Sequence, residues 1–275
     1  ARDLFYALWV PDLFMRRVKG GGKWSLMCPK RSPGLADVVG EAFEELYVSY
    51  EEKGQYVRQV EAQHLWQKIV VSQIETGTPY LLYKDACNTK SNQQNLGVIK
   101  SSNLCAEIVQ YSDRFETAVC NLASLSLPAY IVDGTFDYMA LEQATRHLVR
   151  NLNRIIDVNY YPTHPSRKSN ERHRPIGIGA QGLADVFQML NLPFDSDRAR
   201  AMNKLIFEHI YYAAVDQSCR EAENEYIRAG GRRSCAYNSY DKSPMSMGQF
   251  QFDLWGVTPQ LDWTALRARV KRFGV

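Results

Sequence analysis

The chain has 275 residues, 45% of them hydrophobic, and a mass of 31.5 kDa, which is enough for one large domain or two small ones. Its formal net charge is +3, and its Lys and Arg residues are dispersed rather than gathered in an aromatic-studded stripe, so the charge gives no argument for nucleic-acid binding and no nucleic-acid partner is expected. The sequence has no apolar stretch of about 20 residues and no signal-peptide pattern, so no membrane span is expected and the predicted location is cytoplasmic.

Helices and short strands are predicted to alternate along the chain. Apolar residues recur at helical spacing over 61–75, and Gly77 stands where this helix is expected to end. The run at 80–83 is typical of a strand, and longer helical stripes follow at 137–158 and 196–228. This alternation indicates an α/β fold class with a mainly parallel sheet covered by helices.

A polar, turn-forming segment at 90–97 leads to a stretch in which Asn103, Cys105 and Glu107 alternate with apolar residues. Alternation of this kind favours an extended segment, because every second side chain of a strand lies on the same face. A carboxamide, a thiol and a carboxylate on one face could all contact one small substrate. The alternative is an edge strand with a polar face and an incidental cysteine.

A second thiol, Cys120, lies in a run of apolar and small residues at 118–125 that is typical of a strand buried on both faces. By residue type alone, Cys120 is an ordinary buried thiol. The chain has six cysteines but no CxxC pair and no close Cys/His spacing, which argues against a disulfide framework and against a zinc site. No metal ligands are predicted, and the scattered histidines are interpreted as surface or packed residues.

The segment 177–182 matches the GxGxxG pattern and is followed by a helix-like segment at 183–190. A dinucleotide-binding site needs a clear strand just before the glycines and an acidic residue about 20 positions later. Instead, the basic run 172–175 precedes the glycines, and Met-Asn-Lys at 202–204 lies at the later distance. We therefore interpret the pattern as a tight turn, in which glycine lets strand and helix pack closely.

Four blocks stand in a fixed order along the chain. They are Asn92-Gln93-Gln94-Asn95-Leu96-Gly97, Ser102-Asn103-Leu104-Cys105-Ala106-Glu107, Val119-Cys120-Asn121-Leu122-Ala123-Ser124-Leu125, and Arg172-His173-Arg174-Pro175-Ile176-Gly177-Ile178-Gly179 with Gln181-Gly182-Leu183-Ala184-Asp185. In order, spacing and residues, they resemble the large, catalytic subunit of class I ribonucleotide reductase. The resemblance extends from Arg2-Asp3-Leu4-Phe5 to Trp255-Gly256-Val257-Thr258-Pro259, nearly the whole chain.

This resemblance implies a fold and a set of residue roles. The fold is expected to be part of a ten-stranded α/β barrel, with a central finger loop carrying the catalytic Cys105. Cys105 is implied to become the thiyl radical that removes the ribose 3′ hydrogen, Glu107 to be the general base, and Asn103 to hydrogen-bond the sugar. Substrate binding is thus assigned to Asn103, Leu104, Cys105 and Glu107. Cys120 is implied to be half of the redox-active dithiol that ends the cycle as a disulfide.

The resemblance also implies partners. These are a ribonucleoside diphosphate as substrate, a small subunit whose metal-tyrosyl radical starts the chemistry, thioredoxin or glutaredoxin as reductant, and a second copy of the full-length subunit in a homodimer. No cofactor is expected to bind in this chain, and the ATP and dNTP effectors are expected to bind outside it. Residues 1–275 are interpreted as an incomplete catalytic barrel domain that lacks the N-terminal regulatory part and the C-terminal part. The isolated chain is therefore expected to be inactive.

The chain departs from the family pattern in two places. The segment 226–242 is interpreted as an insertion that forms a solvated surface loop, in which Cys235 is an exposed thiol. Ala106 stands where a hydroxyl residue is more usual, and it is expected to face away from the neighbouring site residues. The cysteines without a family match are predicted to be structural: Cys28, Cys87, Cys219 and Cys235.

Two other functions stay open. One is a reductase of the same barrel superfamily that uses a glycyl radical, and the sequence block around Cys120 argues against it. The other is a non-catalytic descendant that only binds a nucleotide or a partner subunit. The presence of Asn103, Cys105 and Glu107 together argues against that alternative.

Overall fold

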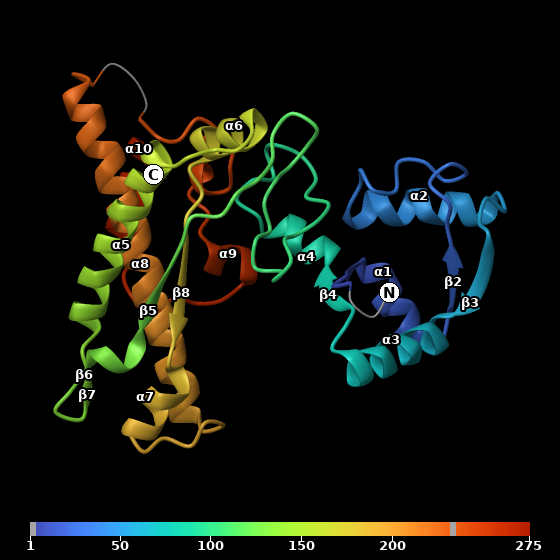
Figure 1. Ribbon diagram of the computed structural model, residues 1–275, viewed down its shortest axis with the longest axis horizontal. Coiled ribbons are helices and arrows are strands. Elements are labelled where there is room, and N and C mark those ends of the chain that lie inside the picture. The colour runs from blue at the N-terminus through green and yellow to red at the C-terminus, as the bar shows by residue number, and fades with distance from the viewer. Residues whose placement is uncertain (1–3, 232–234) are drawn as a thin grey trace. The chain divides into compact units, whose positions relative to one another are not determined.

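The structure is a computed structural model that describes residues 4–231 and 235–275, so Arg2 and Asp3, together with residues 232–234 of the predicted insertion, lie outside the described residues. The chain divides into two compact units, Ala1–Ser112 and Asp113–Val275, and each is described by itself. Helices and short strands alternate in both units, which is a mixed α/β arrangement (Figure 1). No helix among the described residues is both long and apolar enough to cross a membrane.

The strands of the described ranges pair in four two-stranded sheets, and none of these sheets closes on itself. The prediction of one mainly parallel sheet is therefore wrong, since two pairs are parallel and two are antiparallel. One reason lies in a connection that the alternation of elements does not reveal. The strands β6 (Ile131–Val132) and β7 (Thr135–Phe136) are joined by only Asp133 and Gly134, both with positive φ, and so tight a turn forces them to run antiparallel.

The first unit contains β1 (Ala7–Val10), α1 (Asp12–Gly20), β2 (Lys23–Leu26), α2 (Gly40–Glu52), β3 (Arg58–Glu61), α3 (Ala62–Thr76), β4 (Tyr80–Tyr83) and α4 (Lys84–Thr89). The sequence correctly predicts α3 and β4, and Gly77 ends α3 with a φ of 73°. Strand β1 pairs in parallel with β4, so that Val10 lies opposite Tyr83. Strand β2 pairs with β3 in the antiparallel sense.

Helices α1 and α2 pack against these strands through aromatic side chains. Trp24 of β2 stacks on Tyr47 of α2 at 4.5 Å between ring centroids, and Phe14 of α1 meets the edge of Trp24. The Tyr47 hydroxyl accepts a hydrogen bond from the Ser25 amide at 2.8 Å and donates one to the Ser25 carbonyl at 2.7 Å. Tyr47 therefore fixes α2 to β2 with both apolar and polar contacts.

Asp85 of α4 joins the N-terminal ends of two other helices. Its buried carboxylate accepts the Asp12 amide of α1 at 2.7 Å and the Gly40 amide of α2 at 2.6 Å. The first amides of a helix have no partner within that helix, and a carboxylate there also interacts favourably with the helix dipole. Asp85 thus sets the positions of α1 and α2 relative to the end of β4.

Replacing Asp85 by Ala is expected to lower the free energy of unfolding of the first unit by about 3 kcal/mol, because two charge-assisted hydrogen bonds are lost and two buried amides lose their acceptor. Hydrogen–deuterium exchange of peptides from α1 and α2 measures this effect directly. Asp85→Asn keeps one acceptor oxygen and should cause about half the loss. Equal exchange in Asp85→Ala and wild-type protein would contradict the assignment.

The second unit contains β5 (Leu122–Ser126), η1 (Leu127–Tyr130), β6, β7, α5 (Tyr138–Val158), α6 (His164–His173), β8 (Gly177–Gln181), α7 (Leu183–Met189), α8 (Asp197–Arg228), η2 (Met245–Met247), α9 (Gln251–Trp255) and α10 (Thr264–Phe273). The long helices α5 and α8 are confirmed within one residue of their predicted starts. Asp137 caps α5 by accepting the Ala140 amide at 2.9 Å, and Ser196 caps α8 by accepting the Ala199 amide at 3.2 Å.

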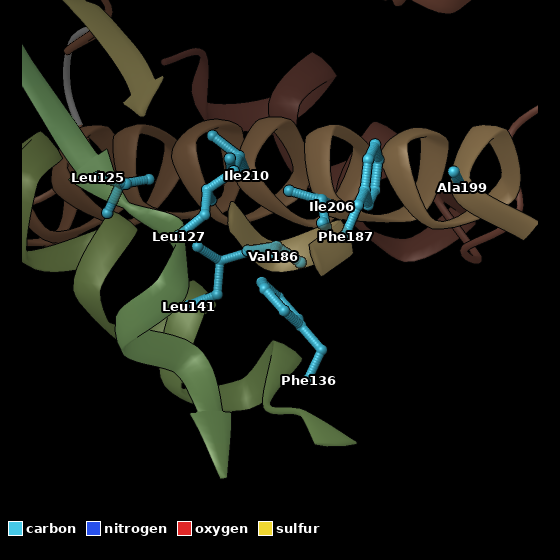
Figure 2. Close-up of a cluster of buried hydrophobic side chains, with 9 residues drawn as sticks. All are labelled: Leu125, Leu127, Phe136, Leu141, Val186, Phe187, Ala199, Ile206 and Ile210. Atoms are coloured by element: carbon cyan, nitrogen blue, oxygen red, sulfur yellow. The ribbon is translucent and has the colours of Figure 1, made fainter. Parts of the chain in front are cut away.

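The main core of this unit lies where β5, η1, α5, α7 and α8 meet (Figure 2). Its buried side chains come from these elements and from β7: Leu125, Leu127, Phe136, Leu141, Val186, Phe187, Ala199, Ile206 and Ile210. Figure 2 shows Val186 between Leu127, Leu141 and Ile206, so α7 closes the space between η1, α5 and α8. This packing fixes β5, and with it the segment that carries Cys120, on a rigid support.

The glycines of the GxGxxG pattern lie mostly in a strand. Gly177 and Gly179 belong to β8, which pairs in parallel with β5, and only Gly182 forms a turn, with a φ of 81°. A Cβ atom on Gly177 would lie 2.6 Å from a Leu122 side-chain atom, and one on Gly182 would lie 2.6 Å from Pro128. The prediction of a tight turn is therefore wrong for Gly177 and Gly179. Close approach between neighbouring elements explains Gly177 and Gly182, while a Cβ atom on Gly179 would make an ordinary contact.

The predicted insertion at 226–242 is less exposed than expected. Its first residues, up to Arg228, continue α8, and Cys235 is partly buried rather than exposed. Tyr240 is buried, and its hydroxyl donates to the Val270 carbonyl of α10 at 2.7 Å. The description as a solvated loop is therefore wrong for these residues, because the segment packs its aromatic side chains against the C-terminal helix.

Candidate functional site

The segment around Cys105 is a tight turn, not the extended segment that the alternation predicts. The Ala106 amide donates to the Asn103 carbonyl at 3.2 Å, and Ala106 has a φ of 66°. A side chain such as that of Asn103 can bind nearby backbone groups and favour a turn over a strand. Ala106 is therefore not a neutral spacer, since it holds a left-handed conformation that non-glycine residues rarely adopt.

The turn still brings Asn103 and Glu107 together. Asn103 Nδ2 donates to Glu107 Oε1 at 2.7 Å, while Asn103 Oδ1 accepts the Ile108 amide at 3.1 Å. Ser102 Oγ closes the loop by donating to the Ile108 carbonyl at 2.6 Å. The carboxamide thus uses one end to hold the backbone and the other to orient the carboxylate of Glu107.

Cys105 lies in this turn between the two paired residues. Its thiol is free and exposed, and the neighbouring Leu104 side chain is 61% exposed. Asn103 and Glu107 are exposed as well. The turn therefore presents a thiol, a carboxylate and a carboxamide to the solvent within five residues of sequence.

Amide side chains hold the loop that leads to this turn. Asn88 of α4 donates to the Ile99 carbonyl at 3.0 Å and accepts the Ile99 amide at 2.7 Å, and both residues are buried. Gln93 accepts the Tyr111 amide at 2.7 Å, which joins the two ends of the loop. The roles of Asn88 and Ser102 are not predicted from the sequence, although Gln93 and Ser102 stand in the blocks that carry the resemblance.

Cys120 lies in the second unit, just before β5. Its side chain is exposed, and so is that of Leu122, while Asn121 between them is buried. The prediction of a strand buried on both faces is therefore wrong. Only one face of this segment packs on the unit, so the burial alternates, and Cys120 points outward.

A buried carboxylate precedes Cys120 and is bound by helix α6. Glu116, 2% exposed, accepts a hydrogen bond from Arg172 at 3.1 Å and lies 3.2 Å from His173 Nε2. Burial lowers the pKa of His173, so the neutral ring donates from Nε2 to Glu116 and accepts the Ser239 hydroxyl at Nδ1, 2.7 Å away. Because Glu116, His173 and Ser239 are all buried, this group anchors the segment rather than offering a reactive serine to a substrate.

Among the remaining cysteines, Cys87 and Cys219 fit the predicted structural positions. Burial raises the pKa of the Cys87 thiol, and it raises that of Cys219 to about 11. Backbone amides of Lys30 and Arg31 lower the pKa of Cys28. All six cysteines are free, and no three His, Cys, Asp or Glu residues within 4–231 and 235–275 gather in a way that could hold a metal ion.

Comparison with known proteins matches the whole chain, residues 1–275, to the family model described as ribonucleotide reductase, barrel domain. The chain is 55% identical to the ribonucleoside-diphosphate reductase large subunit of Caenorhabditis elegans, with all of the chain and 34% of that protein covered. It is 54% identical to the large subunit of Variola virus, covering 35% of it, and 54% identical to the large chain of Neurospora crassa, covering 29% of it. The chain thus spans about a third of the length of these relatives.

Proposed function

The chain belongs to the ribonucleotide reductase barrel-domain family, and from this premise we propose that it supplies catalytic residues for reducing ribonucleoside diphosphates to deoxyribonucleoside diphosphates. In the overall reaction the C2′–O bond of the ribose breaks and a C2′–H bond forms. Two thiols, one of them that of Cys120, supply the two electrons and become a disulfide, and the 2′-hydroxyl leaves as water. A dithiol protein such as thioredoxin or glutaredoxin then reduces that disulfide by exchange.

One observation carries this proposal: the turn at 103–107 presents an exposed thiol beside a carboxylate that a carboxamide orients. Cys105, as a thiyl radical, removes the 3′ hydrogen of the ribose. Glu107 takes the proton of the 3′-hydroxyl, and the Asn103 amide orients the sugar. The thiyl radical originates from a metal-tyrosyl radical in a separate small subunit.

The remaining parts of the proposal concern the complete protein. We place residues 1–275 in a ten-stranded α/β barrel whose other strands come from chain outside them, with the turn at Cys105 as its central finger loop. The single parallel pairs β1–β4 and β5–β8 support this, because each leaves strand edges open for further pairing. The effectors ATP and dNTP bind outside this segment, and the full-length subunit forms a homodimer. The isolated 275-residue chain is expected to be inactive.

Replacing Glu107 by Gln in the full-length subunit is expected to lower kcat by about 10² to 10⁴-fold with little change in KM, because the amide keeps the shape of the side chain but cannot accept the proton. Steady-state formation of deoxynucleotide, with small subunit and dithiol supplied, measures the change. Glu52→Gln is the matched control, since Glu52 is exposed at the end of α2. Equal turnover by Glu107→Gln and Glu52→Gln would remove Glu107 from the mechanism.

A non-catalytic descendant that binds only a nucleotide or a partner subunit is the second candidate. The observation that favours it is the exposure of the turn, because an exposed turn can bind a ligand without any reaction. The same assay distinguishes the two, because a binding protein forms no deoxynucleotide in either the wild-type or the variant form.

A further inference from the structure

The backbone around Cys120 is attached to one helix on both sides of the thiol. Before the cysteine, the Thr117 amide donates to the Pro165 carbonyl of α6 at 3.1 Å, and Glu116 is bound by Arg172 and His173 of the same helix. After the cysteine, Asn121 binds Asn170, which also belongs to α6. Helix α6 is therefore the support on which the Cys120 segment rests.

The contact between Asn121 and Asn170 is a pair of facing amides. Asn121 Nδ2 donates to Asn170 Oδ1 at 2.7 Å, and Asn170 Nδ2 donates back to Asn121 Oδ1 at 3.3 Å. Asn121 Nδ2 also donates to the Pro175 carbonyl at 2.8 Å, and the Asn121 carbonyl accepts the Gly177 amide at 2.9 Å. Asn121 is 5% exposed and Asn170 is fully buried, so no solvent competes for these bonds.

The pair continues to the end of another helix. Asn170 Nδ2 also donates to the Tyr161 hydroxyl, which in turn donates to the Ile156 carbonyl of α5 at 2.7 Å. A buried asparagine costs free energy unless its amide is satisfied, and here both ends are used. These hydrogen bonds fix the orientation of Asn121 relative to α6, and an apolar residue could not replace them.

Burial of Asn121 decides where the Cys120 side chain points. Neighbouring side chains of an extended segment project to opposite sides, so an inward Asn121 leaves Cys120 and Leu122 facing outward, and all three show that pattern of burial. We infer that the Asn121–Asn170 amide pair is a positioning element for Cys120, which fixes its thiol for disulfide formation with a second thiol. This inference rests on the proposed redox role of Cys120.

The step that the pair assists is an oxidation of two thiols. Cys120 and its partner thiol form one S–S bond, release two protons and give two electrons to the ribose intermediate, and an external dithiol later returns them. A fixed thiol raises the effective concentration of one sulfur near the other, whereas a mobile one lowers it. Loss of the amide pair should therefore make the disulfide less stable relative to the dithiol.

The test compares full-length subunits carrying Asn170→Ala, Asn121→Ala or Tyr161→Phe with wild-type protein, in redox buffers of reduced and oxidised dithiothreitol. We expect the equilibrium constant for forming the Cys120 disulfide to fall about tenfold in the two Asn variants, equivalent to about 30 mV. Tyr161→Phe removes only the outer link and should cause a smaller fall in the same direction. Asn153→Ala is the matched control, because Asn153 bonds Arg174 instead of the Cys120 segment.

Thiol alkylation of the same samples separates positioning from unfolding, because labelling of the buried Cys219 reports opening of the unit. If Cys219 is alkylated rapidly in an Asn variant, that variant has opened, and the Cys120 disulfide constant of Tyr161→Phe is then the one compared with wild type. A Cys120 disulfide constant within about twofold of wild type in the folded variants would overturn the inference. Absence of any Cys120 disulfide in wild-type protein after turnover would instead overturn the proposed redox role.

Discussion

Cys105→Ser in the full-length subunit should abolish deoxynucleotide formation and leave nucleoside diphosphate binding intact. Serine keeps the size, the exposure and the turn, and the Asn103–Glu107 hydrogen bond does not involve the replaced atom. The O–H bond of serine is much stronger than the S–H bond of cysteine, so a hydroxyl cannot take over the radical. We expect turnover to fall by at least about a thousandfold, measured as deoxynucleotide formed, with binding followed by equilibrium dialysis.

Cys28→Ser is the control for this substitution. Cys28 is in the same unit and its thiol has a lowered pKa. If the reaction needed any reactive thiol rather than Cys105 in particular, loss of Cys28 would therefore also lower turnover. Its loss should leave turnover within about twofold of wild type. Undiminished turnover by Cys105→Ser would end the thiyl-radical assignment, and loss of nucleotide binding in that variant would make Cys105 a binding residue instead.

The elements that the sequence predicts well are those whose signals are local. The helices α3, α5 and α8 each carry an apolar stripe. Asp137 and Ser196 cap the starts of α5 and α8, and Gly77 ends α3. Strand pairing is not local, since β5 meets β8 across an intervening hairpin and two helices. Alternation of elements therefore predicted the α/β class, but it could not predict which strands pair or in which sense.

The candidate site shows the same division. The residues Asn103, Cys105 and Glu107 were predicted together, and the structure brings Asn103 and Glu107 into contact. Their geometry was predicted wrongly, because one side-chain hydrogen bond to the Ile108 amide outweighs the preference of an alternating segment for a strand. The Asn121–Asn170 pair joins residues 49 positions apart, and no local pattern indicates such a contact.

A second large effect is expected at Asp216 of α8, a residue with no part in the proposed chemistry. Its carboxylate is bound by Arg269 of α10 at 2.7 Å, by Arg220 one turn along α8 at 3.0 Å, and by Arg146 of α5 at 3.1 Å. Although burial acts to raise the pKa of Asp216, hydrogen bonds from these three guanidinium groups lower it overall. One anion thus holds three helices together and offsets the repulsion among the cations.

Replacing Asp216 by Ala should destabilise the contact between these helices by about 3 kcal/mol, because three arginines lose their shared anion. The arginine side chains are partly exposed to solvent, which makes this destabilisation smaller than for a fully buried group. Cys219 gives the measurement, since it is buried on α8 close to Asp216 and its thiol is alkylated only when this region opens. We expect the alkylation rate to rise about a hundredfold.

Asp197→Ala is the matched control for Asp216→Ala, because Asp197 pairs with Arg200 at the start of the same helix with 95% of its side chain exposed, and such pairs contribute little. The effect should also have a defined pH dependence. A carboxylate whose pKa is lowered below 3.8 on folding stabilises the fold above that value, and its contribution is lost only as the pH falls through the folded pKa. The ratio of the Cys219 alkylation rate in Asp216→Ala to that in Asp197→Ala should therefore stay constant between about pH 8 and about pH 6. A ratio near one over this whole range would show that the arginines do not depend on Asp216.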